Sequence, residues 1–226
     1  MVFCRIFFEG LRSIEYKTFK ENFMTTRTNR PIETSLMSTY SRSNLAFVKG
    51  KGVWLFDKKG KMFLDLASGI AVNSLGHSHP KLVKVLADQG SKLWHTSNLY
   101  TVPNQEKLAQ LLTKNTFADK VFFTNSGAES VECAIKIARR YFFSRSQSSR
   151  NRIISFDGSF HGRTMGTISA AGSKKLLEGF GPKLPGFDLV KKLSLDSVEK
   201  KISKQTCAIL VEPILGEGGI VTLSCS

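Results

Sequence analysis

The fold of this chain is constrained most by its short apolar runs, which end directly in turns of small and polar residues. The run 121–124 leads into Asn-Ser-Gly-Ala-Glu at 125–129, and the run 153–156 leads into 157–164. A third run, 208–211, is continuously apolar, as strands buried on both faces of a sheet are. Segments of helical length separate the runs. This alternation predicts an α/β layer fold with the turns at the carboxyl ends of strands.

The first turn combines a helix start with a geometry suited to phosphate. Ser126 and Glu129 have the S-x-x-E spacing of a capping box. Gly127 and Ala128 leave their backbone N–H groups uncovered at the positive end of the helix dipole, which binds phosphate. Taken alone, an ordinary capped helix without a ligand explains the motif more simply. Apolar residues at helical spacing follow, as expected for a helix that packs on a sheet: Ala128, Val131, Ile135, Ala138 and Phe142.

The second turn offers an aromatic ring and a guanidinium group. Phe160 can lie against a heteroaromatic face, and Arg163 can hold a carboxylate in a bidentate fork. A buried aromatic residue beside a surface arginine is an equally good reading of this turn in isolation. This turn therefore indicates a binding site only in combination with the other two turns.

Two carboxylates, Glu212 and Glu217, follow the third apolar run. A metal site needs more ligands than two carboxylates, and the histidines lie elsewhere in the sequence, so no metal is predicted. His77 and His79, which flank Ser78 ahead of Pro80, are interpreted as turn and cap residues.

Composition excludes several classes of protein. The 226 residues are 41% hydrophobic, enough for a sizeable core, and the apolar runs are too short to span a bilayer, which predicts a soluble protein. The net charge of +15 is spread over scattered lysines, so nucleic-acid binding ranks below a solvated surface or the steering of anionic substrates. The four cysteines lack metal or disulfide spacing, which indicates reduced thiols.

The chain is predicted to have three segments. Residues 1–36 form an extension that is either flexible or a mis-called start, and it has only some features of an organelle presequence. Residues 37–98 contain glycine-separated runs that predict a small antiparallel meander, followed by a helix from Pro80 to about Gly90. Residues 99–226 contain a second helix from about Pro103 and then the sheet.

The three turns in this order resemble the class III aminotransferases, which use pyridoxal 5'-phosphate on the fold-type-I scaffold. The resemblance covers about three quarters of the chain and is carried by the following motifs: 65–73, 75–80, 125–129, 160–164 and 211–214. Within that class, residues 92–100 are most similar to the acetylornithine aminotransferases. The chain departs from the usual pattern at Ser130, Cys133 and Leu215.

The resemblance implies roles for individual residues. Ser126, Gly127 and Ala128 would hold the cofactor phosphate, and Phe160 would stack on the pyridine ring. Arg163 would bind a substrate carboxylate. Glu217 matches a switch glutamate that pairs with a distant arginine for one substrate and releases it for 2-oxoglutarate.

The resemblance also implies a reaction that the whole relative would perform. The δ-amino group of N2-acetylornithine would pass to the cofactor and then to 2-oxoglutarate, in arginine biosynthesis. Ornithine or 4-aminobutyrate is the alternative donor. The family continues past this chain to an aspartate and a Schiff-base lysine, so a truncated chain that is inactive alone is expected. An inactive fragment that associates with intact subunits is the alternative. A homodimer and a cytoplasmic location are expected, or a mitochondrial one if 1–36 is a presequence.

Overall fold

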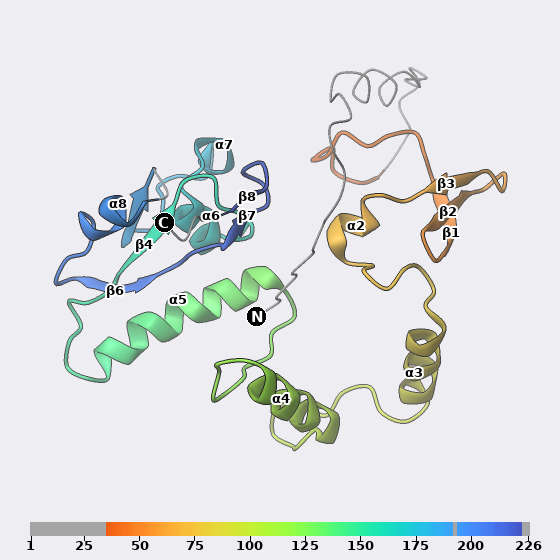
Figure 1. Cartoon of the computed structure of the whole chain (residues 1–226), viewed down its shortest axis with the longest axis horizontal. Helices are drawn as coiled ribbons and strands as arrows, with labels where there is room; N and C mark the ends of the chain where they lie inside the picture. Colours follow the sequence, from red (N-terminus) through yellow and green to blue (C-terminus); the bar gives the residue numbers. More distant parts are fainter. Residues whose placement is uncertain (1–34, 192–193, 223–226) are drawn as a thin grey trace. The chain divides into compact units, whose positions relative to one another are not determined.

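The computed structural model describes residues 35–191 and 194–222 (Figure 1). The chain divides into two compact units, with the division after Lys107. The predicted extension 1–36 lies outside the described residues, apart from its last two. The boundary predicted between residues 98 and 99 stays a prediction.

The upstream unit begins with an antiparallel sheet. Its strands are β1 (Phe47–Lys51), β2 (Trp54–Asp57) and β3 (Met62–Leu64), paired in the order β1-β2-β3. The predicted meander is therefore confirmed, since glycine turns reverse the chain between the runs. The helices that follow are α2 (Ser68–Ala71), α3 (Pro80–Gly90) and α4 (Pro103–Asn115), and the division between the two units falls within α4. The last two begin at the predicted prolines, whose fixed φ suits the first helical turn.

His77 and His79 act as structural residues in this unit. Nε2 of His77 lies 2.7 Å from Oδ2 of Asp65, and this hydrogen bond lowers the pKa of Asp65 below its ordinary value. The backbone of His77 pairs with that of Gly52. His79 is the N-cap residue of α3, although its side chain makes no capping hydrogen bond. The interpretation of His79 as a cap residue is confirmed, whereas His77 lies in a β-bridge with Gly52 rather than in a turn.

The downstream unit contains a parallel sheet with helices on both faces. The elements are α5 (Gly127–Phe143), β4 (Arg152–Phe156), α6 (Met165–Ala171), α7 (Lys174–Leu177), β5 (Phe187–Val190), α8 (Leu195–Glu199), β6 (Thr206–Ile209), β7 (Ile214–Leu215) and β8 (Val221–Thr222). β4 is the central strand, in the order β5-β4-β6, and it runs parallel to both neighbours. The predicted α/β layer fold is confirmed.

The core lies on the two faces of β4. On one face, Ile153 packs with Ile135 of α5, Ala170 of α6 and Phe187 of β5. On the other face, Ile154 and Phe156 pack with Val190, and Val198 of α8 covers them. Within the seam predicted for α5, Ile135 is buried and Val131 and Ala138 pack against the core. β4 is thus covered on both sides, which explains why Ile154 is fully buried.

Two expectations about strands are wrong. Residues 121–124 form no strand, because a strand needs a hydrogen-bonded neighbour and none of the described strands pairs with them. The run predicted at 208–211 begins two residues earlier, as β6, and is not buried on both faces. Ile209 is 46% exposed and Val211 is 43% exposed. β6 is an edge strand of the described sheet, with β4 as its one neighbour there.

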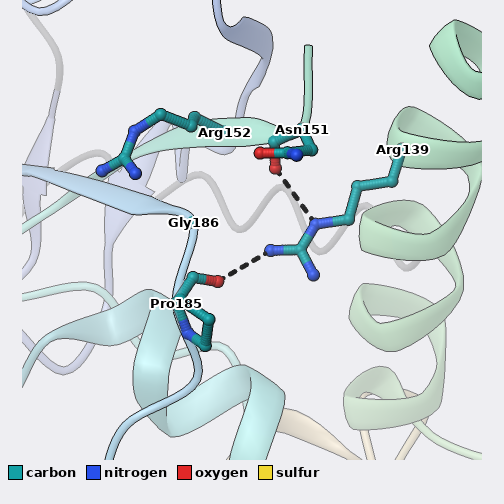
Figure 2. A pocket seen from close by; sticks show the side chains of 5 residues that line it. All are labelled: Arg139, Asn151, Arg152, Pro185 and Gly186. Carbon is teal, nitrogen blue, oxygen red and sulfur yellow. Dashed lines mark hydrogen bonds between the residues drawn. The ribbon is translucent and has the colours of Figure 1, made fainter. Parts of the chain in front are cut away.

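A pocket of about 400 Å³ lies at the amino-terminal end of the sheet (Figure 2). It is lined by Arg139, Asn151, Arg152, Pro185 and Gly186. Arg139 donates from Nε to the carbonyl oxygen of Asn151 and from Nη2 to that of Pro185, at 3.1 and 3.0 Å. These bonds tie α5 to the segments that enter β4 and β5.

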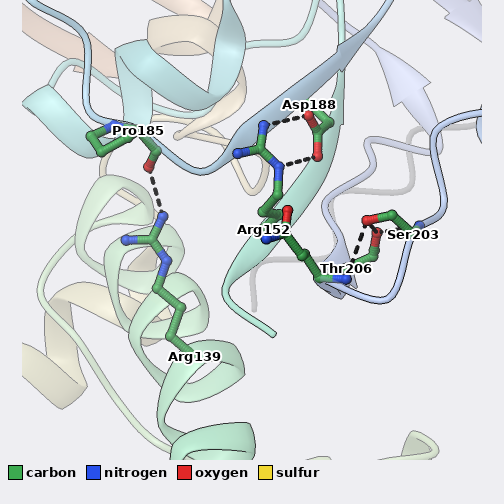
Figure 3. Close-up of polar contacts among 7 residues, drawn as sticks. Arg139, Arg152, Pro185, Asp188, Ser203 and Thr206 are labelled. Carbon is green, nitrogen blue, oxygen red and sulfur yellow. Dashed lines mark hydrogen bonds and ion pairs between the residues drawn. The ribbon is translucent and has the colours of Figure 1, made fainter. Parts of the chain in front are cut away.

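The guanidinium of Arg152, like that of Arg139, is held by hydrogen bonds within the protein, as Figure 3 shows. Its Nη2 and Nε donate to the two carboxylate oxygens of Asp188, at 2.6 and 2.8 Å. The hydrogen bond from Arg152 lowers the pKa of Asp188 below its ordinary value. Both arginines therefore serve the structure of this end of the sheet, and the predicted site lies at the opposite end.

Candidate functional site

The first turn leads into α5 and leaves open space at the N-terminus of this helix. The hydroxyl oxygen of Ser126, the N-cap residue, accepts a hydrogen bond from the backbone N–H of Glu129 at 3.2 Å. The carboxylate of Glu129 accepts from the backbone N–H of Asn125 at 2.6 Å. The predicted capping box is thus formed in its first half, while the glutamate caps one residue earlier than expected.

Gly127 lies beside open space at this helix start. A Cβ atom built on Gly127 would meet no atom within 4 Å. The N–H groups of Gly127 and Ala128 belong to the first helical turn, whose donors have no partner inside the helix. The side chain of Ser126 accepts one hydrogen bond, and its O–H remains a donor by its chemistry. Three donors therefore flank an open space at the positive end of the α5 dipole.

The second turn follows β4 and presents its ring to the outside. Phe160 is 39% exposed, whereas His161 next to it is 5% exposed. Arg163 is also exposed, directly before Thr164, which caps α6. Thr164 and Thr167 form a complete capping box, because each side chain accepts a hydrogen bond from the other's backbone N–H. The turn therefore leads into a well-defined helix start.

The first two turns are in direct contact. A Cβ atom on Gly162 would lie 2.7 Å from Cβ of Ala128, and Gly162 has a φ of +118°. A Cβ atom on Gly166 would lie 2.5 Å from Oε1 of Glu132, and the hydroxyl of Thr164 donates to that same oxygen. Glycine is thus needed at position 162 for the second turn to approach α5 closely, whereas at position 166 the near atoms are the end of the flexible Glu132 side chain. The structure brings the predicted phosphate turn and the turn that carries Phe160 together.

The third corner lies against the second turn. Oε1 of Glu212 accepts a hydrogen bond from the backbone N–H of Phe160 at 2.9 Å. A Cβ atom on Gly218 would lie 3.1 Å from the carbonyl oxygen of Gly158, beside the buried Leu215. The three motifs found in the sequence therefore meet at one end of the unit.

Burial sets the charge of the groups in this corner. Burial raises the pKa of Glu212 above its ordinary value. The hydrogen bond from the N–H of Phe160 lowers this pKa, and the charge of Glu217 raises it. Burial also lowers the pKa of His161 to about 4. His161 is therefore neutral at pH 7, so the 3.9 Å separation between its Nδ1 and Oε1 of Glu212 is not an ion pair.

Sequence reasoning missed several contacts. Glu132 and Thr164 link α5 to the second turn, and Glu212 holds the backbone of Phe160. The T-x-x-T spacing at 164–167 was the one signal for this helix start, and nothing local pointed to Glu132. Glu217 lies exposed in the loop between β7 and β8, so its predicted role stays a prediction.

Other kinds of site find no support in the described residues. Within 35–191 and 194–222, no three His, Cys, Asp or Glu side chains gather as metal ligands. In the same residues, no helix combines the length and hydrophobicity needed to cross a membrane. The two cysteines placed by the structure, Cys133 and Cys207, are free thiols.

A comparison with known families places the chain. The profile of the family described as aminotransferase class-III matches residues 37–226. The chain belongs to the class-III aminotransferases. An acetylornithine aminotransferase of Agrobacterium fabrum is 58% identical over 185 residues, which make up 82% of this chain and 46% of that relative. The chain spans about half the length of the curated relatives it matches.

Solved structures agree with this assignment. The N-acetylornithine aminotransferase of Stenotrophomonas maltophilia is 35% identical, with a TM-score of 0.67 over 81% of this chain and 45% of that one. An ornithine aminotransferase of Toxoplasma gondii, reported with partial occupancy of PLP at its active site, is 25% identical, with a TM-score of 0.78 over 93% and 51% of the two chains. The described sheet and its helices are therefore part of the fold-type-I arrangement, as the sequence predicted.

Proposed function

We propose that the corner formed by the three turns binds pyridoxal 5'-phosphate and serves a transamination. The observation that carries the proposal is the contact of Gly162 with Ala128, which brings the turn that bears the exposed Phe160 against the start of α5. The membership of the chain in the class-III aminotransferases supports the same cofactor.

The residues present fit the phosphate of this cofactor. The space beside Gly127 is one that a side chain would fill, and it adjoins the first-turn N–H groups and the hydroxyl of Ser126. These donors would hold the phosphate without a lysine, since the helix dipole adds partial positive charge. The ring of Phe160 would lie against the pyridine ring and exclude water from one of its faces.

The remaining residues would orient the substrates. When bound, pyridoxal 5'-phosphate supplies an aldehyde that accepts the amino group and a conjugated ring that acts as an electron sink. Arg163 would bind a substrate carboxylate in a bidentate fork, since its guanidinium lies on the same turn as Phe160. Glu217 would distinguish the two substrates from the loop between β7 and β8. Both roles follow from the family motif.

The proposed reaction transfers the δ-amino group of N2-acetylornithine to 2-oxoglutarate. The δ-carbon of the donor becomes an aldehyde, and the keto carbon of 2-oxoglutarate becomes the amine-bearing carbon of glutamate. The curated relatives at 50–58% identity over about four fifths of the chain support this donor over ornithine or 4-aminobutyrate. A homodimer, a cytoplasmic location and the inactivity of these 226 residues alone stay predictions.

Changing Gly127 to glutamate tests the phosphate site. We expect Gly127→Glu to weaken binding of pyridoxal 5'-phosphate by about tenfold or more, because a carboxylate would enter the space of the phosphate. The free energy of unfolding should stay equal or rise slightly, since an acidic residue in the first turn favours a helix. Titration calorimetry measures the affinity, and urea unfolding measures the stability.

Gly90→Glu is the matched control. It adds the same charge at a glycine whose built Cβ also meets no atom within 4 Å, but in α3. Its affinity for pyridoxal 5'-phosphate should equal that of the unchanged chain. Equal binding by Gly127→Glu, or equal binding of pyridoxal and pyridoxal 5'-phosphate by the unchanged chain, would contradict the phosphate site.

Changing Arg163 to alanine tests the substrate role. With pyridoxal 5'-phosphate at saturation, Arg163→Ala should weaken binding of 2-oxoglutarate by about tenfold or more, because a charge-assisted carboxylate fork is lost. The three candidate amines are titrated in the same way, and N2-acetylornithine should bind most tightly. Arg163→Lys should recover only part of the affinity, because an ammonium cannot form the fork. Unchanged binding by Arg163→Ala would exclude the role.

A further inference from the structure

The backbone of Phe160 is held by a residue that lies far away in the sequence. Its N–H donates to Oε1 of Glu212 at 2.9 Å, across a separation of 52 residues. The side chain of Glu212 is 22% exposed, so this carboxylate is partly shielded from water. A hydrogen bond from an N–H to a carboxylate is stronger than one between neutral groups. The contact therefore restrains the second turn at the residue that carries the ring.

The other contacts of this turn fix different residues. Gly162 rests against Ala128, and Thr164 donates to Glu132, so the end of the turn is tied to α5. At its beginning, the backbone N–H of Asp157 donates to the carbonyl oxygen of Val190 at 2.9 Å. Glu212 supplies the long-range hydrogen bond to Phe160, between these two anchors. Loss of this hydrogen bond would leave both ends of the turn anchored, while the position of the Phe160 ring between them could vary.

We propose that Glu212 is a positioning residue, whose carboxylate fixes the Phe160 backbone and so orients the Phe160 ring toward a bound cofactor. The inference rests on the proposed function, since the ring has a ligand to face only if the cofactor binds. Glu212 itself touches the turn rather than the ligand. His161, whose Nδ1 lies 3.9 Å from the same oxygen, is neutral at pH 7, so the N–H of Phe160 is the donor that Oε1 of Glu212 accepts from.

Two substitutions separate the hydrogen bond from the charge. Glu212→Gln keeps a side-chain oxygen that can accept from the N–H of Phe160, whereas Glu212→Ala removes the acceptor. Glu178→Ala, at an exposed residue after α7, is the matched control. Urea unfolding of each variant confirms that the unit is folded before any comparison.

Amide hydrogen exchange measures the restraint directly. In Glu212→Ala, the amide of Phe160 should exchange about 10- to 100-fold faster, because a hydrogen bond to a charged group is lost. The amide of Ile154, in the core of β4, should exchange at an unchanged rate, which a general loss of structure would not allow. Glu212→Gln should keep most of the protection, and Glu178→Ala should keep all of it.

Binding of pyridoxal 5'-phosphate to the 226-residue chain measures the consequence. Glu212→Ala should raise the Kd about tenfold, and Glu212→Gln should restore it to within about threefold of the unchanged chain. An unaltered Kd or Phe160 exchange rate in Glu212→Ala would overturn the inference and leave the proposed function intact. Glu212→Gln as damaging as Glu212→Ala would also overturn it. If the unchanged chain bound no pyridoxal 5'-phosphate, the proposed function would fail and this inference with it.

Discussion

Replacing Gly162 with alanine is expected to lower the free energy of unfolding of the downstream unit by about 2–6 kcal/mol. Strain at a φ of +118° contributes about 1–3 kcal/mol. Crowding adds about 1–3 kcal/mol, because the new Cβ would lie 2.7 Å from Cβ and 3.0 Å from Cα of Ala128. Urea unfolding followed by circular dichroism measures the change. Affinity for pyridoxal 5'-phosphate should fall as well, because relief of the crowding moves the turn away from α5.

Gly179→Ala separates these two effects. Gly179 has a φ of +78°, but a Cβ atom there would meet no atom within 4 Å. Its substitution should cost only the conformational strain, about 1–2 kcal/mol, and leave ligand binding unchanged. Equal costs for the two variants would show that the contact between Gly162 and Ala128 does not hold the turn in place.

Replacing Ile154 with alanine should cost about 2–5 kcal/mol, the range for a large-to-small change in a core. The side chain of Ile154 is fully buried in the central strand, in a cluster with Phe156 and Val190 that Val198 of α8 covers. A cavity would remain because the neighbouring strands, held by their ladders, can close in only partly. Urea unfolding of purified protein measures the cost.

Ile137→Ala is the control for this variant. Ile137 lies in α5 with 58% of its surface exposed, and alanine favours a helix more than isoleucine does. Its substitution should change the free energy of unfolding by no more than about 0.5 kcal/mol. A similar cost at both positions would contradict the assignment of β4 as the centre of the core.

The parts of the fold that depend on local spacing could be predicted from the sequence. The seam of α5 and the cap at Ser126 follow from residues within one or two helical turns of each other. The meander follows in the same way from glycine turns between apolar runs. In each case the interacting residues are close in the sequence, so their spacing alone encodes the contact.

The contacts that assemble the site could not be predicted in this way. Glu132 with Thr164, and Glu212 with Phe160, join residues 32 and 52 positions apart. The two errors about strands have a related cause, because pairing and burial depend on neighbours that the run itself does not contain. Residues 121–124 are as β-prone as β4, yet they have no partner among the described strands.

The strand order has a consequence for synthesis on the ribosome. β4 is made before both of its partners, since β5 and β6 follow it in the chain and pair with it on opposite sides. The most buried strand of the sheet is therefore synthesised while neither of its two edges has a strand to pair with. Until β6 emerges, the run Ile153-Ile154-Ser155-Phe156 presents an open backbone edge to other nascent chains. Rapid docking of α5, which is already complete when β4 emerges, would shield one face during that interval.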